Sequence, residues 1–312
     1  MVTAVVRGIL ADNLVTDPRG FRAINDQDFA QWILANGGHP DVVDFPLIRG
    51  VYDLVFGYAD ADPEQPSFAA GVMIFLIGMV LFEYKGAIFW KMTAGMGDVI
   101  IAPMYQALRR RGVRFEFFHR VDGLHLDARR QAVDAITMGR QVRLADERTQ
   151  YEPLVTVGNL PVFPNSPDVR QLAEPDRARI TDWHLLETHW GHETDVESRR
   201  LRRGTDFDRV VVATSIGMLP YIAGELLDDQ QAWRDMTSHV RTVATQSFQL
   251  WLRADERTLG WDEPGVTTAG YIPPFETWAS MGQTLWAEQW PAEDQPRSVA
   301  YFCGTLAAEL PP

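Results

Sequence analysis

Apolar and polar residues follow each other differently in successive parts of the chain, and each pattern predicts different elements. The first part is aromatic-rich and helical in character: Asp26 can cap a helix over Gln27–Ala35, which Gly37-Gly38 would end. The run Ser67–Phe82 carries no charge but is shorter than the roughly 20 residues of a bilayer-spanning helix. We therefore predict a buried helix there, with a helix that dips into a membrane as the alternative.

Near residue 90 the pattern changes to alternating strands and helices. Ala87–Met92 could form a strand that leads into the glycine-rich turn at residues 94–98. A helix is predicted from this turn to about Arg111, and Pro103 should delay or kink its start. Apolar and charged residues then alternate over Val113–Phe117, which is the period of a strand. The stretch therefore predicts a strand, a turn, a helix and a second strand in succession.

The rest of the chain predicts further strands separated by turns. Asp208–Thr214 has four consecutive apolar residues after a polar start, which suits a strand covered on both faces. An amphipathic helix is expected over Trp278–Trp290. Other predicted extended segments are Ala132–Met138 and Gln141–Ala145, paired as a hairpin around Gly139-Arg140, and then Tyr151–Phe163, Thr245–Leu252 and Ser298–Cys303. The predicted fold class is mixed α/β (α+β).

Length, charge and cysteine content narrow the class of protein. The 312 residues are enough for roughly two domains. With 29 Lys and Arg against 42 Asp and Glu, the net charge is −13, so the phosphate contacts of a nucleic-acid-binding protein are not expected. The single cysteine, Cys303, excludes a disulfide within the chain and suits the reducing cytoplasm. The sequence has no recognisable signal peptide or transmembrane segment.

The turn at Gly95-Met96-Gly97 approaches a dinucleotide fingerprint, which needs a strand, then G-x-G-x-x-G, then a helix, with an acidic residue about 20 positions further on. Glu116 lies at a suitable distance. Ile100, however, holds the place of the third glycine, where a side chain would push the helix off the strand. The turn is more simply explained as a helix start capped by Asp98, and an NAD(P)-binding loop is the alternative.

Other chemistry-bearing motifs are weak. His189 and His192 could share a helix face, but the Gly191 between them weakens a helix and no separate third zinc ligand is identifiable. Ser215 follows a predicted strand without the G-x-S-x-G pattern of a hydrolase nucleophile. Cys303 has the character of a small buried apolar residue. We therefore predict no metal site and assign no catalytic residue.

Two segments resemble, in the same order, a stretch of flavin oxidoreductases of the amine oxidase and phytoene or squalene desaturase type. The first is MTAGMGD at residues 92–98, followed by a helix, a Gly112-Val113 step and a strand that ends at Val121. The second is FDRVVVAT at residues 207–214, which looks like the strand of that family that leads back to the flavin. The resemblance covers Lys91–Pro220 well and the flanks more loosely.

The resemblance implies an incomplete FAD-binding domain of the glutathione-reductase-like type at residues 91–220. Residues 1–90 and 221–312 would then be substrate-domain segments. The implied reaction is the passage of a hydride from a substrate C–N or C–C bond to the flavin, with the protein supplying position and the exclusion of water. The sequence does not identify the substrate. The apolar run Phe68–Phe82 and the late tryptophans favour a hydrophobic small molecule, although core packing explains both, and peripheral contact with a membrane is a further alternative.

The resemblance also implies particular cofactor contacts. In that family, main-chain atoms of the valine that ends the first strand pair with the adenine of FAD, and Val121 matches that valine. Ala213 and Thr214 match the residues that close the second strand and approach the cofactor through main-chain atoms. Gly95 and Gly97 match glycines of the turn before the helix. These five residues form the predicted cofactor site.

The sequence also departs from the family. The family's N-terminal G-x-G-x-x-G and its C-terminal flavin-contacting segment are not found here, so the chain resembles an internal fragment. Without glycine-backed amides at a helix N-terminus, the pyrophosphate has no preformed site, and this chain alone should bind FAD weakly or not at all. Two alternatives stay open: a non-catalytic binding or scaffold protein that has lost its cofactor, and an NAD(P)-dependent enzyme that uses Gly95 and Gly97.

Overall fold

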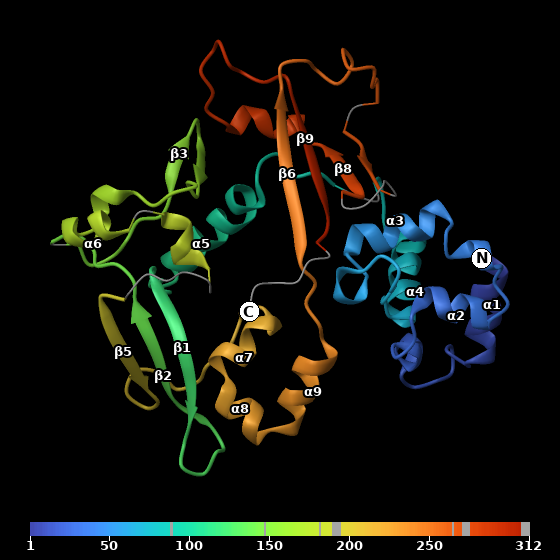
Figure 1. Ribbon diagram of the computed structural model, residues 1–312, viewed down its shortest axis with the longest axis horizontal. Coiled ribbons are helices and arrows are strands. Elements are labelled where there is room, and N and C mark those ends of the chain that lie inside the picture. Colours follow the sequence, from blue (N-terminus) through green and yellow to red (C-terminus); the bar gives the residue numbers. More distant parts are fainter. Residues whose placement is uncertain are drawn as a thin grey trace. The chain divides into compact units, whose positions relative to one another are not determined.

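The computed structural model describes residues 1–87, 90–146, 148–180, 182–188, 195–263, 265–269 and 275–306. The chain divides into two compact units, one made of Met1–Ala94 with Val243–Pro312 and the other of Gly95–Thr242, which we call unit 1 and unit 2. Both units contain helices and sheets (Figure 1), so the predicted mixture of helix and strand is confirmed. Residues 221–242, which the resemblance places in a substrate-domain segment, pack with unit 2.

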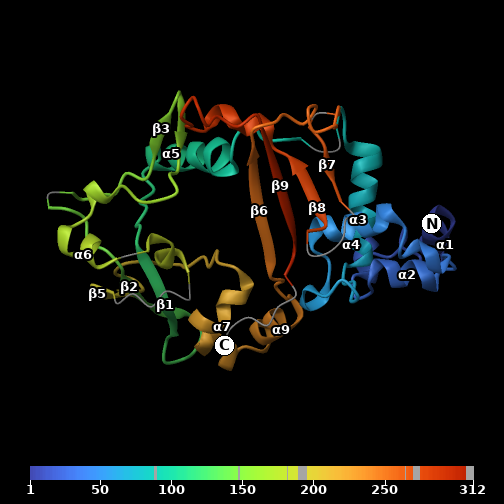
Figure 2. The ribbon, with the colours of Figure 1, turned by 45° about the horizontal axis from the view of Figure 1, so that its top comes forward.

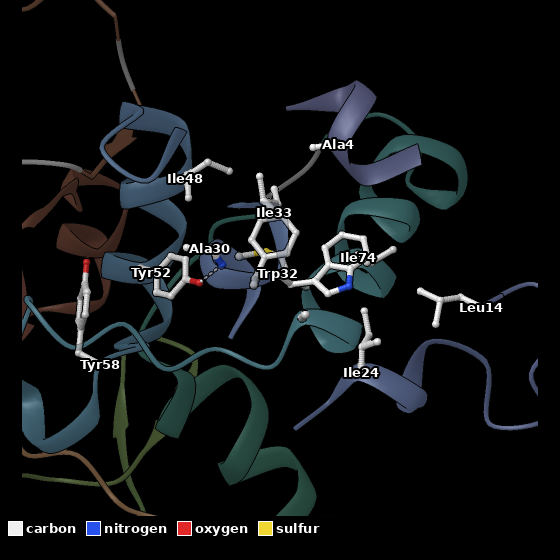
Figure 3. Packing of buried hydrophobic residues seen from close by; sticks show 13 residues of the cluster. Ala4, Leu14, Ile24, Ala30, Trp32, Ile33, Ile48, Tyr52, Tyr58 and Ile74 are labelled. Carbon is white, nitrogen blue, oxygen red and sulfur yellow. Dashed lines mark hydrogen bonds between the residues drawn. The ribbon is translucent and has the colours of Figure 1, made fainter. Parts of the chain in front are cut away.

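The N-terminal part of unit 1 is helical and encloses an apolar core (Figure 3). Its helices and 3-10 turns are α1 (Val2–Ala11), η1 (Gly20–Ile24), α2 (Phe29–Ala35), η2 (Pro40–Val42), α3 (Pro46–Val55), η3 (Ala59–Ala61) and α4 (Ala70–Gly78). Trp32 and Ile33 of α2 are almost fully buried at the centre. The Tyr52 hydroxyl of α3 accepts a hydrogen bond from the Ala30 amide (3.0 Å), which fixes α3 to α2.

The cap of α2 is not the predicted one. The carboxylate of Asp28, rather than that of Asp26, accepts the amide of Gln31 (3.1 Å), and the helix begins two residues later than expected. The second oxygen of Asp28 accepts the Phe68 amide (2.9 Å), so the same side chain also holds the segment that leads into α4. Gly37 follows the helix end with φ +79°, which agrees with the predicted glycine stop.

α4 and the π-helical turn η4 (Met79–Glu83) occupy the run that was predicted as a buried helix, but only one face is buried. Met73 and Ile74 face the core, whereas Phe75 and Leu76 are exposed and Phe82 is 83% exposed. The predicted buried helix therefore forms, but it is buried on one face only, because the core closes over only one side of α4. Among the described residues, no helix is both long and apolar enough to cross a membrane.

The sheet of unit 1 has the strand order β6-β9-β8-β7, with antiparallel neighbours throughout (Figures 1 and 2). β6 (Thr245–Leu252) and β9 (Ser298–Thr305) confirm two predicted strands, and they pair along their whole length. β8 (Thr277–Ser280) and β7 (Thr267–Thr268) extend the sheet beyond β9.

The helix predicted over Trp278–Trp290 does not form. Trp278 lies in β8, paired with Phe302 of β9, and the 3-10 turn η9 (Gly282–Ala287) follows the strand. The spacing of the tryptophans suggested a helix. The first residues of this segment instead pair with β9 as strand β8, and this pairing overrides the local pattern.

Unit 2 is built around a second antiparallel sheet of order β1-β2-β5 (Figure 1). Its strands are β1 (His119–Leu126), β2 (Val133–Arg140) and β5 (Glu197–Arg202), and a separate hairpin consists of β3 (Val155–Val157) and β4 (Leu160–Val162). This hairpin lies within the predicted extended stretch Tyr151–Phe163.

The hairpin predicted around Gly139-Arg140 does not form. Both residues lie inside β2, and Gln141–Ala145 forms no strand. The chain reverses earlier, between β1 and β2, where Asp127 accepts the amides of Arg129 (3.1 Å) and Gln131 (2.9 Å). An aspartate that bonds the backbone two residues on is a stronger turn signal than the glycine.

The helices of unit 2 begin with the π-helical turn η5 (Gly97–Ile101), which continues into α5 (Ala102–Arg110). Pro103 occupies the first turn of α5, as the predicted late start requires, and Gly112 follows the helix end with φ +86°. The remaining helices and turns are η6 (Val169–Gln171), α6 (Glu174–Arg179), η7 (Trp183–Glu187), η8 (Ile216–Met218), α7 (Leu219–Ile222), α8 (Gly224–Asp229) and α9 (Gln231–His239).

Two strands expected in unit 2 do not form. Residues 113–117 are irregular, and the rings of Phe115 and Phe117 pack edge-on against Tyr105 of α5 instead. Asp208–Thr214 is irregular as well, with Val211 89% exposed, because α7 and α8 rather than this segment cover β1. Before the glycine turn, Ala87 and residues 90–92 are not in a strand, and residues 88–89 lie outside the described part.

Candidate functional site

Gly95 and Gly97 lie in the turn that starts the helical segment of unit 2. The same turn contains the carboxylate of Asp98. The Gly95 carbonyl accepts the amides of Asp98 (2.9 Å) and Val99 (3.1 Å). A Cβ added to Gly95 would lie 3.0 Å from the Asp98 carboxylate, whose other oxygen accepts the Phe163 amide (3.3 Å). Asp98 therefore braces the turn rather than capping the helix as predicted. Its negative charge at the helix start opposes a bound pyrophosphate.

Val121 is the third residue of β1 and not the end of a strand, as the resemblance implied. It pairs with Met138 of β2, and the register shifts directly after it, so that Asp122 is the extra residue of a bulge. Within the described residues, β1 is an edge strand that pairs with β2 on one side only. An edge strand presents main-chain N–H and C=O groups that no ladder uses, and these groups can pair with the edge of a ligand ring.

Ala213 and Thr214 are exposed in the irregular segment between β5 and η8. Val212, immediately before them, packs into the apolar cluster that contains Leu124 of β1 and Leu219 of α7. This one side chain anchors the segment to the sheet, while the next two residues stay exposed.

The register of β1 and β2 decides which way Val121 faces. Val121 pairs with Met138 and Leu124 pairs with Ile136. Because Met138 and Ile136 are two residues apart on one strand and paired residues share a face, all four side chains point to the same side of the sheet. Val212 packs into the cluster on that side. The structure therefore places Val121 and Val212, which is two residues before Thr214, on one face of the sheet. The bulge in β1 and the missing second strand were not foreseen.

A cavity of ≈ 660 Å³ lies in unit 1, and it was not found from the sequence. The ammonium of Lys91 donates to the carbonyls of Ser280 and Val266, and the Ser280 hydroxyl donates to Glu256. Burial lowers the pKa of Lys91, and the Glu256 charge partly offsets that effect. Lys91 and Ser280 are 189 residues apart, so no local motif could have joined them.

A chain of three polar side chains in unit 2 was also missed. Nε2 of His125 lies 2.9 Å from Oγ1 of Thr137, and Nδ1 lies 2.9 Å from Oε1 of Glu225. This is the hydroxyl–imidazole–carboxylate order of an activated nucleophile. None of the three residues lines any of the four cavities found among the described residues. Their hydrogen bonds tie β1, β2 and α8 together.

The remaining sequence candidates bring no further chemistry together. The segment His189–Glu193, with its two histidines, lies outside the described residues. Within the described part, no three His, Cys, Asp or Glu side chains are grouped so that they could hold a metal ion. Burial raises the pKa of the Cys303 thiol, which is the opposite of what a nucleophilic cysteine needs.

No family model matches the chain, and comparison with the curated proteins and with the solved structures gives no significant match.

Proposed function

We propose that this chain is part of an FAD-dependent oxidoreductase of the amine oxidase or desaturase type. One observation carries the proposal: Val121 and the segment ending in Thr214, which the resemblance pairs with the cofactor, approach one face of one sheet. The order of elements along the chain also agrees with that family: the glycine turn comes first, then α5, β1 and this segment. All four belong to a single compact unit. The antiparallel sheet of unit 2 would be the part of an FAD-binding domain that this chain supplies. In the complete protein, the flavin would accept a hydride from a substrate C–N or C–C bond.

The described residues fit one half of FAD better than the other. Free main-chain groups on the outer edge of β1 suit the hydrogen-bonding edge of adenine, and Ala213 is small enough for a close approach. The pyrophosphate has no comparable site, because Asp98 places a carboxylate at the start of η5. We therefore expect this chain to bind the adenine end of FAD weakly and to leave the flavin end without contacts.

Equilibrium dialysis of the purified chain against adenosine, FAD and NAD tests the proposal. Adenosine and FAD should bind with similar weak affinity, because the pyrophosphate adds nothing. Ala213→Trp should weaken both by about tenfold, since the indole would crowd the adenine position. The matched control is Val211→Trp, two residues earlier at a position 89% exposed, which should leave binding unchanged.

Three results would decide against this reading. Binding of neither adenosine nor FAD favours the scaffold alternative, which the carboxylate of Asp98 at the helix start supports. Selective binding of NAD, lost in Gly97→Trp, favours the nicotinamide alternative. A stoichiometric flavin absorption band in the purified chain would contradict the expected weak binding and would require a pyrophosphate site elsewhere.

A further inference from the structure

Several aromatic rings contribute to the walls of a cavity of ≈ 400 Å³ in unit 2. The rings come from separate parts of the chain: Phe117 and Phe118 before β1, Tyr151 and Phe163 on either side of the β3-β4 hairpin, and Trp183 in η7. The volume falls within the range of small-molecule pockets, roughly 300–1,000 Å³. None of the five predicted cofactor residues lines it.

The aromatic walls hold one another in place. The rings of Phe117 and Phe118 pack edge-to-face against the ring of Tyr151, at centroid distances of 5.5 Å and 4.9 Å. The Tyr151 hydroxyl accepts the Asp168 amide (2.8 Å), and the ring is only 7% exposed. The cavity is thus preformed, and a ligand would not have to order its walls.

Phe118 adopts a backbone conformation that its side chain disfavours. Its φ is +59°, in the left-handed region that bulky residues seldom occupy. The Phe118 carbonyl accepts the Gln141 amide (2.8 Å), and the Gln141 side chain donates to the Leu186 carbonyl (3.0 Å). The surrounding structure therefore imposes this conformation, and strain of this kind concentrates at ligand sites.

The polar side chains that line the cavity include those of His119, Gln141, Asn165, Ser166 and His184. Among the described residues that line it there is no Asp, Glu, Lys or Arg. Nε2 of His119 lies 3.1 Å from the Arg199 guanidinium, and Nδ1 lies 2.7 Å from the Phe117 carbonyl. Arginine only donates and a carbonyl only accepts, so this arrangement suits a ring that accepts at Nε2 and donates from Nδ1. The indole N–H of Trp183 has no acceptor within the described part of the chain.

We propose that this cavity binds an uncharged planar aromatic molecule of one or two rings, with a hydrogen-bond acceptor directed at the indole N–H of Trp183. Flat rings suit its edge-to-face walls, and a charged group would be desolvated without a counter-charge. The proposal does not depend on the flavin proposal, because a pyrophosphate could not be neutralised here.

The experiment compares quinoline with naphthalene, which has the same shape without the ring nitrogen, by equilibrium dialysis of the full chain. Quinoline should bind saturably at one site and more tightly than naphthalene. Trp183→Phe keeps an aromatic wall but removes the donor, so it should abolish the preference for quinoline. Ser166→Trp, at the exposed rim, should block the cavity and weaken both ligands by about tenfold.

Thr205→Trp, on an exposed turn of the same unit, is the matched control and should bind like the parent chain. Circular dichroism tests whether each variant is folded. If Ser166→Trp does not fold, Asn165→Trp at the same rim takes its place. Absence of saturable quinoline binding, or equal binding by the parent chain and the blocked variant, overturns the proposal. Binding of adenosine should respond to Ala213→Trp and not to Ser166→Trp, which separates the two sites.

Discussion

Nδ1 of His125 on β1 lies 2.9 Å from Oε1 of Glu225 on α8. The other carboxylate oxygen of Glu225 accepts the amide of Leu126 (2.8 Å), a main-chain donor at the end of the edge strand. One side chain thus ties α8 to the edge of the sheet through both of its oxygens. The contact also occupies a strand edge that would otherwise be open to another chain.

Glu225→Gln should weaken this tie. The Leu126 amide, followed by His125, holds the pKa of Glu225 below its ordinary value of 4.5. The stabilisation is therefore present above that value and is lost as the pH falls through the lowered pKa. We expect a loss of about 1 kcal/mol in the free energy of unfolding at pH 7, because the carboxylate is partly exposed and screened.

Urea unfolding of the two proteins at pH 7 and at pH 3 measures the effect. The difference between them should shrink at the lower pH. Glu293→Gln, at an exposed position, serves as the control and should change neither value. A loss of the same size at both pH values would show that the charge of Glu225 has no part in it.

Two glycines of α4 should respond to alanine in opposite directions. A Cβ on Gly71 would overlap the carbonyl oxygen of Phe21 in η1, and that backbone atom cannot move aside cheaply. Gly71→Ala should therefore cost about 2–4 kcal/mol of stability. A Cβ on Gly78 meets nothing within 4 Å, so Gly78→Ala should stabilise the helix by about 0.5–1 kcal/mol. Thermal melts of both variants test this, and a Gly71→Ala variant as stable as the parent would refute the packing of α4 against η1.

Glu276 should make unit 1 less stable as the pH rises. It is 2% exposed, and burial followed by the Asp53 carboxylate raises its pKa above the ordinary 4.5. A group with a raised pKa stabilises the fold below its ordinary value, and this contribution is lost as the pH rises through the raised one. The main-chain amides of Glu276 and Thr305, followed by Arg49 of α3, offset part of the shift. Burial raises the pKa values of the nearby Tyr58 and Cys303, so both titrate only in alkaline solution.

Glu276→Gln removes the buried ionisation and keeps the shape. The variant should be more stable than the parent by about 1 kcal/mol at pH 8 and equal to it near pH 4. Melting temperatures across this range provide the measurement, with Glu64→Gln on the surface as the control. A variant that is less stable than the parent at pH 8 would mean that the carboxylate is ionised and paired.

Asp176 should be the most sensitive carboxylate of unit 2. It is 2% exposed and accepts the main-chain amide of Arg143 (2.7 Å) and two nitrogens of the same guanidinium. Asp176→Asn cannot keep this fork and should cost about 2–3 kcal/mol. Chemical denaturation tests it against the exposed Asp134→Asn, and equal stabilities would show that the Arg143 contact contributes nothing.

Local signals predicted some elements well and failed where a partner was needed. Short patterns of apolar residues predicted the strands β6 and β9. Proline predicted the late start of α5, and glycine predicted the ends of α2 and α5. The strands expected over Val113–Phe117 and Asp208–Thr214 have equally good patterns but find no neighbouring strand in the structure. A strand is stable only when another strand or a covering layer meets it, and the pattern of one segment carries no information about that.

The candidate sites show the same division. From the sequence came Gly95, Gly97, Val121, Ala213 and Thr214, through the order of two segments and a resemblance. Three features came only from the tertiary structure. Val121 and Val212 lie on one face of the sheet, and the carboxylate of Asp98 lies against the glycine turn. A cavity is enclosed between Phe118 and Trp183. Helix ends, turns and strand tendencies depend on interactions within a few residues, so the sequence by itself determined them. Faces, cavities and paired charges depend on side chains far apart in the chain, and these meet only when the core packs.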